Sequence, residues 1–198
     1  SEMCIRDSND IAVITGDMDG YYRYIEEEFS KNNIPAFIDH KHNIASNPFV
    51  DGIKAAIEIV EKDFSYETVF HLIRLGFLPI DREAADVMEN YVLQSGRRGF
   101  KSYGRLWEKA YKGMTAEELD MVNQAREKLV EIIRPLREEL KKKKATVREY
   151  TKAVYQFVQA NNMQRQIDDY RIEFQNQGEI SRAKEYEQVY VTIITLLD

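Results

Sequence analysis

The balance between strand-like and helix-like patterns constrains the fold of this chain more than any other feature. Two short apolar runs near the start are typical of β-strands, Asp10–Thr15 and Ile34–Asp39. Between them, from Met18 to Phe29, apolar side chains recur at helical spacing. A strand, a helix and a second strand within about 30 residues predict one βαβ unit of a parallel sheet.

The rest of the sequence, from Asn47 onward, carries helical signals and no clear further strand. Several polar residues stand where a helix N-cap is expected, and two of them form the capping-box pattern with a glutamate three residues later. These caps are Asn47 before Pro48, Ser65, Asp81, Thr115 with Glu118, and Thr146 with Glu149. Glycines predict helix ends at Gly76, Gly96 and Gly178, and Pro135 predicts a kink or a stop. The run Val189–Leu197 has helical spacing but is β-branched enough to form a strand.

These patterns predict an α/β start followed by a mainly α-helical domain. Two parallel strands do not form a stable sheet alone, because such strands are normally buried on both faces. We therefore expect the missing strands to lie outside this sequence, and the chain to be a piece of a larger protein. The predicted parts are residues 1–8, an adaptor-derived or disordered tail, residues 9–46, the βαβ part, and residues 47–198, a helical domain truncated at its C-terminus.

Composition excludes several classes of protein. The single cysteine, Cys4, allows no disulfide framework and no cysteine-ligated metal cluster within the chain. No apolar run approaches the ~20 residues of a membrane span, and we expect a cytoplasmic protein. No Gly-rich phosphate loop is present. The string Asp39, His40 and His42 is a weak metal pattern, more typical of solvated or capping groups, and His71 is expected to be packed or half-exposed in a helix.

Charge is unevenly distributed, although the net charge of −6 is acidic. Residues 97–112 contain six basic residues and one acidic residue, Glu108. Aromatic residues, Phe100 among them, lie between these cations, so the segment could neutralise phosphates and stack on bases. The candidate DNA-binding residues are Arg97, Arg98, Lys101, Tyr103, Arg105 and Trp107. The alternative is that the aromatics belong to the core and the cations form a solvated rim.

A second basic stretch, residues 134–148, holds seven basic residues against two acidic ones. We interpret its lysine run, Lys141–Lys144, as a solvated helix end, because the helix dipole alone favours cations there.

Several segments together resemble a known family. The first strand, the helix and the Ile34-Pro35 strand are similar to the fourth conserved region of superfamily-one helicases. The closer resemblance is to the B subunit of the AddAB-type ATP-dependent helicase–nuclease. It rests on DIAVITGDMDGYYRYIEEEF, IPAFIDHK, NPFV, DFSYETVF, LIRLGF and ENYVLQSGRRG, in this order, and covers nearly everything after residue 9.

The resemblance implies a place in double-strand break processing for recombination. Residues 9–46 would belong to the second motor-like domain, and residues 47–198 to its helical insertion. In the family, ATP with Mg, the phosphate loop and the iron–sulfur nuclease lie in other segments, so we expect no cofactor here. Active motors carry an arginine three residues after the position of Val13; Gly16 stands there and offers no cation to the γ-phosphate.

We therefore expect a scaffold and DNA-channel segment of a helicase/deoxyribonuclease, without catalytic residues of its own. The implied partners are DNA and the A subunit of the heterodimer, with no membrane contact. One alternative is a helical protein-interaction module that docks the partner protein without touching DNA. Another is a small nucleotide-binding enzyme, which the missing phosphate loop disfavours.

Overall fold

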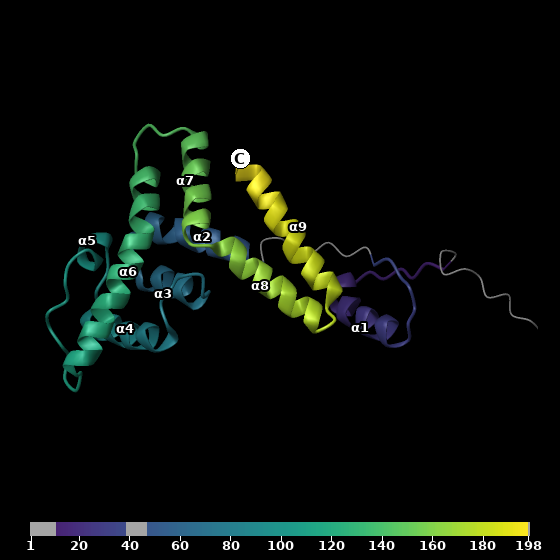
Figure 1. The fold of residues 1–198 in the computed structure, drawn as a ribbon, viewed down its shortest axis with the longest axis horizontal. Helices are drawn as coiled ribbons and strands as arrows, with labels where there is room; N and C mark the ends of the chain where they lie inside the picture. Colours follow the sequence, from purple (N-terminus) through teal and green to yellow (C-terminus); the bar gives the residue numbers. More distant parts are fainter. Residues whose placement is uncertain (1–10, 39–46, 198) are drawn as a thin grey trace, which may run out of the picture. The chain divides into compact units, whose positions relative to one another are not determined.

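The computed structural model describes residues 11–38 and 47–197, which contain nine α-helices and no β-strand (Figure 1). The chain divides into two compact units, Ser1–Asn43 and Ile44–Asp198. The assignment of the first part to a motor-like domain and of the second to an insertion stays a prediction. The tail at residues 1–8 and the string at Asp39, His40 and His42 lie outside the described residues.

The first unit contains the predicted helix, α1 (Met18–Lys31). Asp17 is its N-cap, and the carboxylate of this residue accepts a hydrogen bond of 3.0 Å from the Gly20 amide. Asn32 is its C-cap, and the side-chain amide of this residue donates to the Glu28 carbonyl at 2.7 Å. The helical part of the prediction for this unit is therefore confirmed.

The two flanking strands are not formed, so the predicted α/β start is wrong and the described fold is helical. Residues 11–15 and 34–38 have no strand pairing. Their apolar side chains face solvent, with Ile14 93% exposed and Phe37 92% exposed. The physical reason is that a strand gains its hydrogen bonds only from a neighbour, and no described segment supplies one. β-branched composition alone does not make a strand.

The second unit is built from eight helices over its described residues. They are α2 (Pro48–Glu61), α3 (Tyr66–Arg74), α4 (Arg82–Ser95), α5 (Phe100–Tyr103), α6 (Ala116–Leu140), α7 (Val147–Ala160), α8 (Met163–Asn176) and α9 (Ile180–Leu197). The long helix α6 is central, because α2, α4, α5 and α7 all pack against it. The predicted mainly helical part is therefore confirmed over the described residues.

The predicted helix starts are confirmed by their hydrogen bonds. The Asn47 side chain accepts from the Phe49 amide at 3.0 Å, and the Asp81 carboxylate accepts from the Ala84 amide at 2.8 Å. Thr115 and Thr146 each form a complete capping box with the glutamate three residues later. Such caps satisfy amides that have no partner inside the helix, and each contributes about 1 kcal/mol.

Helix α6 does not stop at Pro135, contrary to one of the predicted outcomes there. The helix continues to Leu140, with Pro135 inside it. Proline removes one backbone hydrogen bond and crowds the preceding turn. Pro135 lies on the exposed side, while Ile133 is fully buried and Leu136 is 3% exposed. The packing of these two side chains holds the last turns in helical register.

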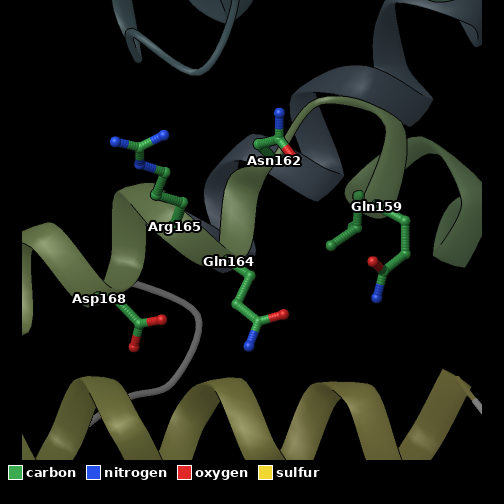
Figure 2. Close-up of a pocket in the computed structure, with 6 residues that line it drawn as sticks. Gln159, Asn162, Gln164, Arg165 and Asp168 are labelled. Atoms are coloured by element: carbon green, nitrogen blue, oxygen red, sulfur yellow. The ribbon is translucent and has the colours of Figure 1, made fainter.

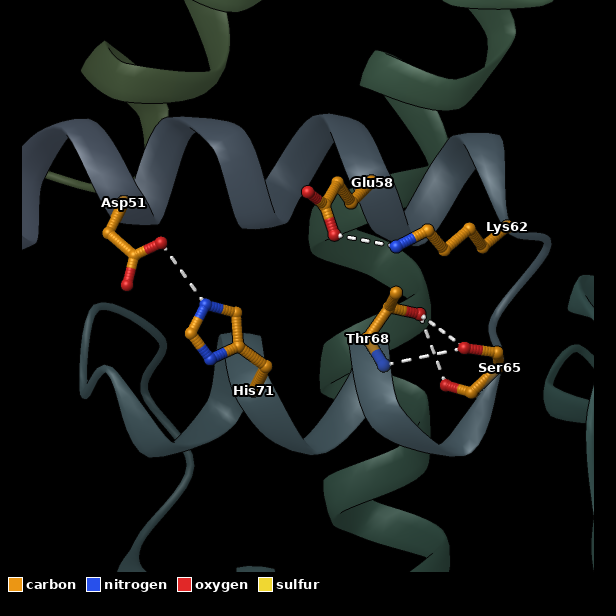
Figure 3. Close-up of polar contacts among 6 residues, drawn as sticks. All are labelled: Asp51, Glu58, Lys62, Ser65, Thr68 and His71. Carbon is orange, nitrogen blue, oxygen red and sulfur yellow. Dashed lines mark hydrogen bonds and ion pairs between the residues drawn. The ribbon is translucent and has the colours of Figure 1, made fainter. Parts of the chain in front are cut away.

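Helices α2 and α3 pack against each other beside α6 (Figure 3). The His71 ring nitrogen lies 3.2 Å from an Asp51 carboxylate oxygen, so the exposed histidine links the two helices. Ser65 caps α3, and its carbonyl and hydroxyl bond Thr68 at 3.1 and 3.2 Å. These contacts place His71 in a surface pair between helices.

The core of the second unit is closely packed at Gly52 on α2. A β-carbon built at Gly52 would lie 2.7 Å from the Phe77 ring and 3.0 Å from the Met163 side chain. Phe77 and Met163 are themselves buried, so only glycine allows α2 to approach them this closely.

Helices α8 and α9 form a hairpin. The predicted break at Gly178, whose φ is 79°, lies in the turn between them. The Tyr186 ring packs against Phe174 and Tyr170, with centroid distances of 5.2 and 6.1 Å. The ambiguous run Val189–Leu197 is helical, as part of α9. None of the helices in the described ranges is long and apolar enough to cross a membrane.

Candidate nucleic-acid interface

The cationic loop, defined here as residues 97–112, joins α4 to α6 and includes the short helix α5. Two of its candidate stacking residues are buried, since Tyr103 and Trp107 are both 0% exposed, while Phe100 is partly exposed. The Trp107 ring stacks on Tyr91 of α4 at a centroid distance of 5.0 Å and an angle of 6°. Tyr103 meets the same ring edge-on at 5.1 Å. Tyr103 and Trp107 are thus core residues, and the structure leaves neither free to stack on bases.

Two polar residues of α6 hold this loop in place. Asn123 accepts from the Trp107 amide and donates to the Trp107 carbonyl, both at 2.9 Å. Arg126 donates to the Tyr103 carbonyl at 2.6 Å and to the Asn123 side chain at 3.2 Å. Both α6 residues are buried, and burial lowers the pKa of Arg126 below its usual value.

Sequence reasoning missed Asn123 and Arg126. The available signal was their position, since both lie next to buried apolar residues of α6, Val122 and Ala125. Polar residues at core positions of a helix require partners, and backbone carbonyls of a neighbouring loop are common ones.

Further hydrogen bonds fix the loop against α4 and within itself. The Tyr91 hydroxyl donates to the Lys109 carbonyl at 2.9 Å, and the Trp107 indole donates to the Ser102 carbonyl at 2.9 Å. The loop backbone is therefore anchored at several points between Ser102 and Lys109. The exposed side chains of the loop therefore extend into solvent from fixed backbone positions.

The cations of the loop point to solvent around this buried anchor. Five of them are exposed: Arg98, Lys101, Arg105, Lys109 and Lys112. Arg97 is partly exposed, with its guanidinium carbon 5.8 Å from the Trp107 ring centroid. None of the six forms an ion pair with an acidic residue in the described part of the chain. The surface is therefore free to neutralise anions.

A second group of residues, the Phe100 cluster, joins α5 to α6 and consists of Phe100, Asp63, Arg134 and Arg137. The guanidinium carbon of Arg137 lies 4.1 Å above the Phe100 ring, and that of Arg134 lies at 5.6 Å. An Asp63 carboxylate oxygen accepts from the Phe100 amide at 3.3 Å. The two arginines fall within the second basic stretch, but a sequence pattern does not show that both face α5.

One pocket of about 190 Å³ opens where α7 meets α8 (Figure 2). Five of its six lining residues are polar or charged; the lining consists of Val158, Gln159, Asn162, Gln164, Arg165 and Asp168. Asp168 is paired with Arg171 at 3.6 Å. The described residues include no group of three or more His, Cys, Asp or Glu side chains that could hold a metal ion. The pocket lies on the surface between the end of α7 and the start of α8.

The fold and its exposed cations define a helical module with a fixed, positively charged surface. No family model matches the chain. Among curated proteins, the chain is 35% identical over 192 residues to the B subunit of the ATP-dependent helicase/deoxyribonuclease of Lachnoclostridium phytofermentans, covering 96% of the chain and 17% of that protein. Proteins of the same name from Clostridium botulinum (strain Loch Maree) and Clostridioides difficile are 36% and 32% identical, covering 96% and 98% of the chain.

These proteins are homologues of the chain over nearly all of its length, so the predicted resemblance to the B subunit is confirmed. The chain spans only 17% to 18% of the length of these relatives. It corresponds to one segment of a much longer protein type.

Proposed function

We propose that the chain serves as a non-catalytic segment of the B subunit of an ATP-dependent helicase/deoxyribonuclease, in which its helical unit holds a cationic surface against DNA. The observation that carries this proposal is the cationic loop, whose five exposed cations have no acidic partner among the described residues and surround a buried aromatic anchor. The names of the homologues supply the context of a DNA-processing complex.

The chemistry of the surface fits backbone contact better than base reading. Lysine and arginine neutralise phosphates and release counterions, which gives affinity without sequence preference. Base stacking by Tyr103 or Trp107 is not part of the proposal, because both rings are buried. Since the loop backbone is anchored by Asn123 and Arg126, little ordering is required when phosphates bind.

The wider role follows from the family resemblance. We place the chain in a bacterial cytoplasmic complex that processes double-strand breaks for recombinational repair, with the A subunit as its partner. Within such a complex, ATP with Mg and the iron–sulfur cluster would be bound by other segments. Purified chain should therefore show no DNA-stimulated ATP hydrolysis above a buffer blank, and clear hydrolysis would contradict this part of the proposal.

The direct test removes three loop cations at once, Arg98→Ala, Lys101→Ala and Arg105→Ala, and measures DNA affinity at several salt concentrations. Each lost phosphate contact should reduce the salt slope of log K by roughly 0.7 to 0.9, so three contacts remove about two units or more. A matched control removes three exposed cations elsewhere, Lys128, Lys152 and Lys184. This control variant has the same net charge as the loop triple variant, and it should keep most of the salt slope of log K.

If both variants are folded and show the same salt slope, the proposal that the cationic loop binds DNA is contradicted. That result would favour the second candidate function, docking of a partner protein. One observation supports that function: α9 carries Val191 at 56% exposure and Leu196 at 71% exposure, beyond the residues packed on the core. Exposed apolar side chains mark a protein interface when they belong to a contiguous patch, and these two are the exposed large apolar side chains in the last two turns of α9. Weaker association with the partner protein in a Val191→Ser, Leu196→Ser variant would then be expected.

A further inference from the structure

The Phe100 cluster contains an arginine whose hydrogen-bonding capacity is largely unused. The Nε of Arg137 is buried and has no hydrogen-bond partner within the described ranges. Its terminal nitrogen lies 3.9 Å from an Asp63 oxygen, which is beyond hydrogen-bond distance. A buried donor without a partner costs about 1–3 kcal/mol, so such a group in a folded protein requires an explanation. The buried Nε is closed to solvent, but the side chain as a whole is partly exposed and its terminal nitrogens make no hydrogen bond in the described ranges, so these remain available to an external acceptor.

The position of Arg137 is fixed by its contact with Phe100. The guanidinium carbon lies 4.1 Å above the ring, and the side chain is 28% exposed. The ring in turn packs edge-on against buried Phe64 at 5.3 Å. A guanidinium lying over an aromatic ring keeps its planar fork of N–H groups available at its edge. Because the Nε is buried, the edge open to a bidentate phosphate contact is the one formed by the two terminal nitrogens.

The other charges near Arg137 come from α6 itself and from Asp63. Arg134 shares the Phe100 ring at 5.6 Å, and Lys141 follows one helical turn after Arg137. Glu138 and Glu131 also lie within one turn of Arg134, but neither forms an ion pair with it. The α6 surface next to α5 is thus cationic at Arg134 and Arg137, with Lys141 at the C-cap of the helix and acidic neighbours at the margin.

Asp63 occupies an unusual backbone position opposite Arg137. Asp63 and Phe64 have φ values of 46° and 57°, in the left-handed region. This turn at the end of α2 brings the exposed Asp63 carboxylate to the Phe100 amide and toward Arg137. A carboxylate here attracts the guanidinium but repels an approaching phosphate, so it should weaken anion binding at this site.

We propose that Arg134 and Arg137, held on Phe100, form a binding site for a backbone phosphate of nucleic acid, next to the cationic loop. This inference rests on the proposed function and extends the DNA surface from α5 onto α6. Arg137 would supply the bidentate contact and Arg134 a second charge, while Asp63 would limit the affinity. The contact is made with the phosphate alone, so it gives no base specificity.

The first test compares Arg137→Met with Lys128→Met in DNA titrations of the 198-residue chain. Methionine keeps the apolar stem of Arg137 over Phe100 but removes the guanidinium. Lys128 is exposed on the same helix, nine residues earlier and so about 180° around it at 3.6 residues per turn. Arg137→Met should flatten the salt slope by roughly 0.7 to 0.9 and weaken binding about fivefold to eightfold near 0.1 M salt. Lys128→Met should do neither.

The second test is a substitution that should strengthen DNA binding instead of weakening it. Asp63→Asn keeps the oxygen that accepts from Phe100 but removes the charge, and asparagine tolerates the left-handed backbone. DNA binding should tighten by about twofold to fivefold, the range of an exposed charge–charge interaction. Asp86→Asn, on the exposed side of α4, is the control and should leave affinity unchanged. This arm keeps the inference testable if Arg137→Met fails to fold.

The outcomes separate this inference from the proposed function. A flattened slope in the loop triple variant, with Arg137→Met and Asp63→Asn both unchanged, would leave the DNA surface standing and overturn the arginine site. An unchanged slope in all variants would overturn both. Loss of thermal stability in Arg137→Met without any change in slope would assign Arg137 to holding α5. Arg137-dependent binding of inorganic phosphate, with DNA affinity unchanged, would overturn the assignment to nucleic acid.

Discussion

The segment at residues 11–38 and the helical unit at residues 47–197 contain similar kinds of apolar side chain but use them differently. In the helical unit, Trp107 and Leu129 are completely buried, and α6 is surrounded by other helices. In the N-terminal segment, Ile14 and Phe37 are more than nine-tenths exposed. The difference shows that apolar composition fixes a structure only when another element is present to cover it.

Replacement of Trp107 should have the largest effect on the free energy of unfolding. Trp107→Ala removes a fully buried ring that packs on Tyr91 and Tyr103, and a loss of about 3–5 kcal/mol is expected. In the other region, Phe37→Ala removes a ring that is 92% exposed and should change stability by less than about 0.5 kcal/mol. Urea denaturation followed by circular dichroism measures both. Similar losses in the two variants would remove the distinction between the regions.

A pair of glycine substitutions sharpens the comparison at intermediate size. Gly52→Ala places a methyl group 2.7 Å from the Phe77 ring, and overpacking costs about 1–3 kcal/mol. Helix propensity returns up to about 1 kcal/mol, so a net loss of about 1–2 kcal/mol is expected. A β-carbon at Gly16 meets nothing within 4 Å, so Gly16→Ala should not destabilise the chain. The same urea titration measures the free energy of unfolding of both variants. A Gly52→Ala variant more stable than the original chain would show that the packing between α2 and Phe77 can accommodate a methyl group.

The smallest expected effect is at a helix cap. Thr146→Ala removes the side chain that accepts from the Glu149 amide and breaks the capping box of α7. The expected loss is about 1 kcal/mol in the cooperative unfolding transition. Asp17→Ala removes the equivalent cap of α1 and should reduce helical signal without shifting that transition. A shift of the transition in Asp17→Ala would show that α1 unfolds together with the second unit.

Local signals predict much of the helical unit. Capping boxes, Pro48 after Asn47, and Gly96 with a φ of 64° mark helix ends through hydrogen bonds between near neighbours. Such contacts are readable from sequence, because both partners lie within a few residues. The strands predicted in the first unit rest on composition alone, and a strand depends on a distant partner that composition does not reveal.

The candidate interface is predictable only in part for the same reason. The cluster of cations in residues 97–112 is visible in the sequence, and its exposure follows from charge. Whether Tyr103 and Trp107 face solvent depends on Tyr91, Asn123 and Arg126, which come from other helices. The facing of Arg134 and Arg137 toward Phe100 likewise depends on how α5 docks on α6.

Hydrogen exchange of the whole chain tests the central distinction between the two regions most directly, because it reports on both in one sample. Amides of Ile11–Ile14, which lie outside any helix and face largely to solvent, should exchange at nearly the rate of an unfolded peptide. Amides of α6 between Val122 and Ile133 should be the slowest and exchange only through global unfolding. Slow exchange at Ile11–Ile14, comparable to that of α6, would contradict the account.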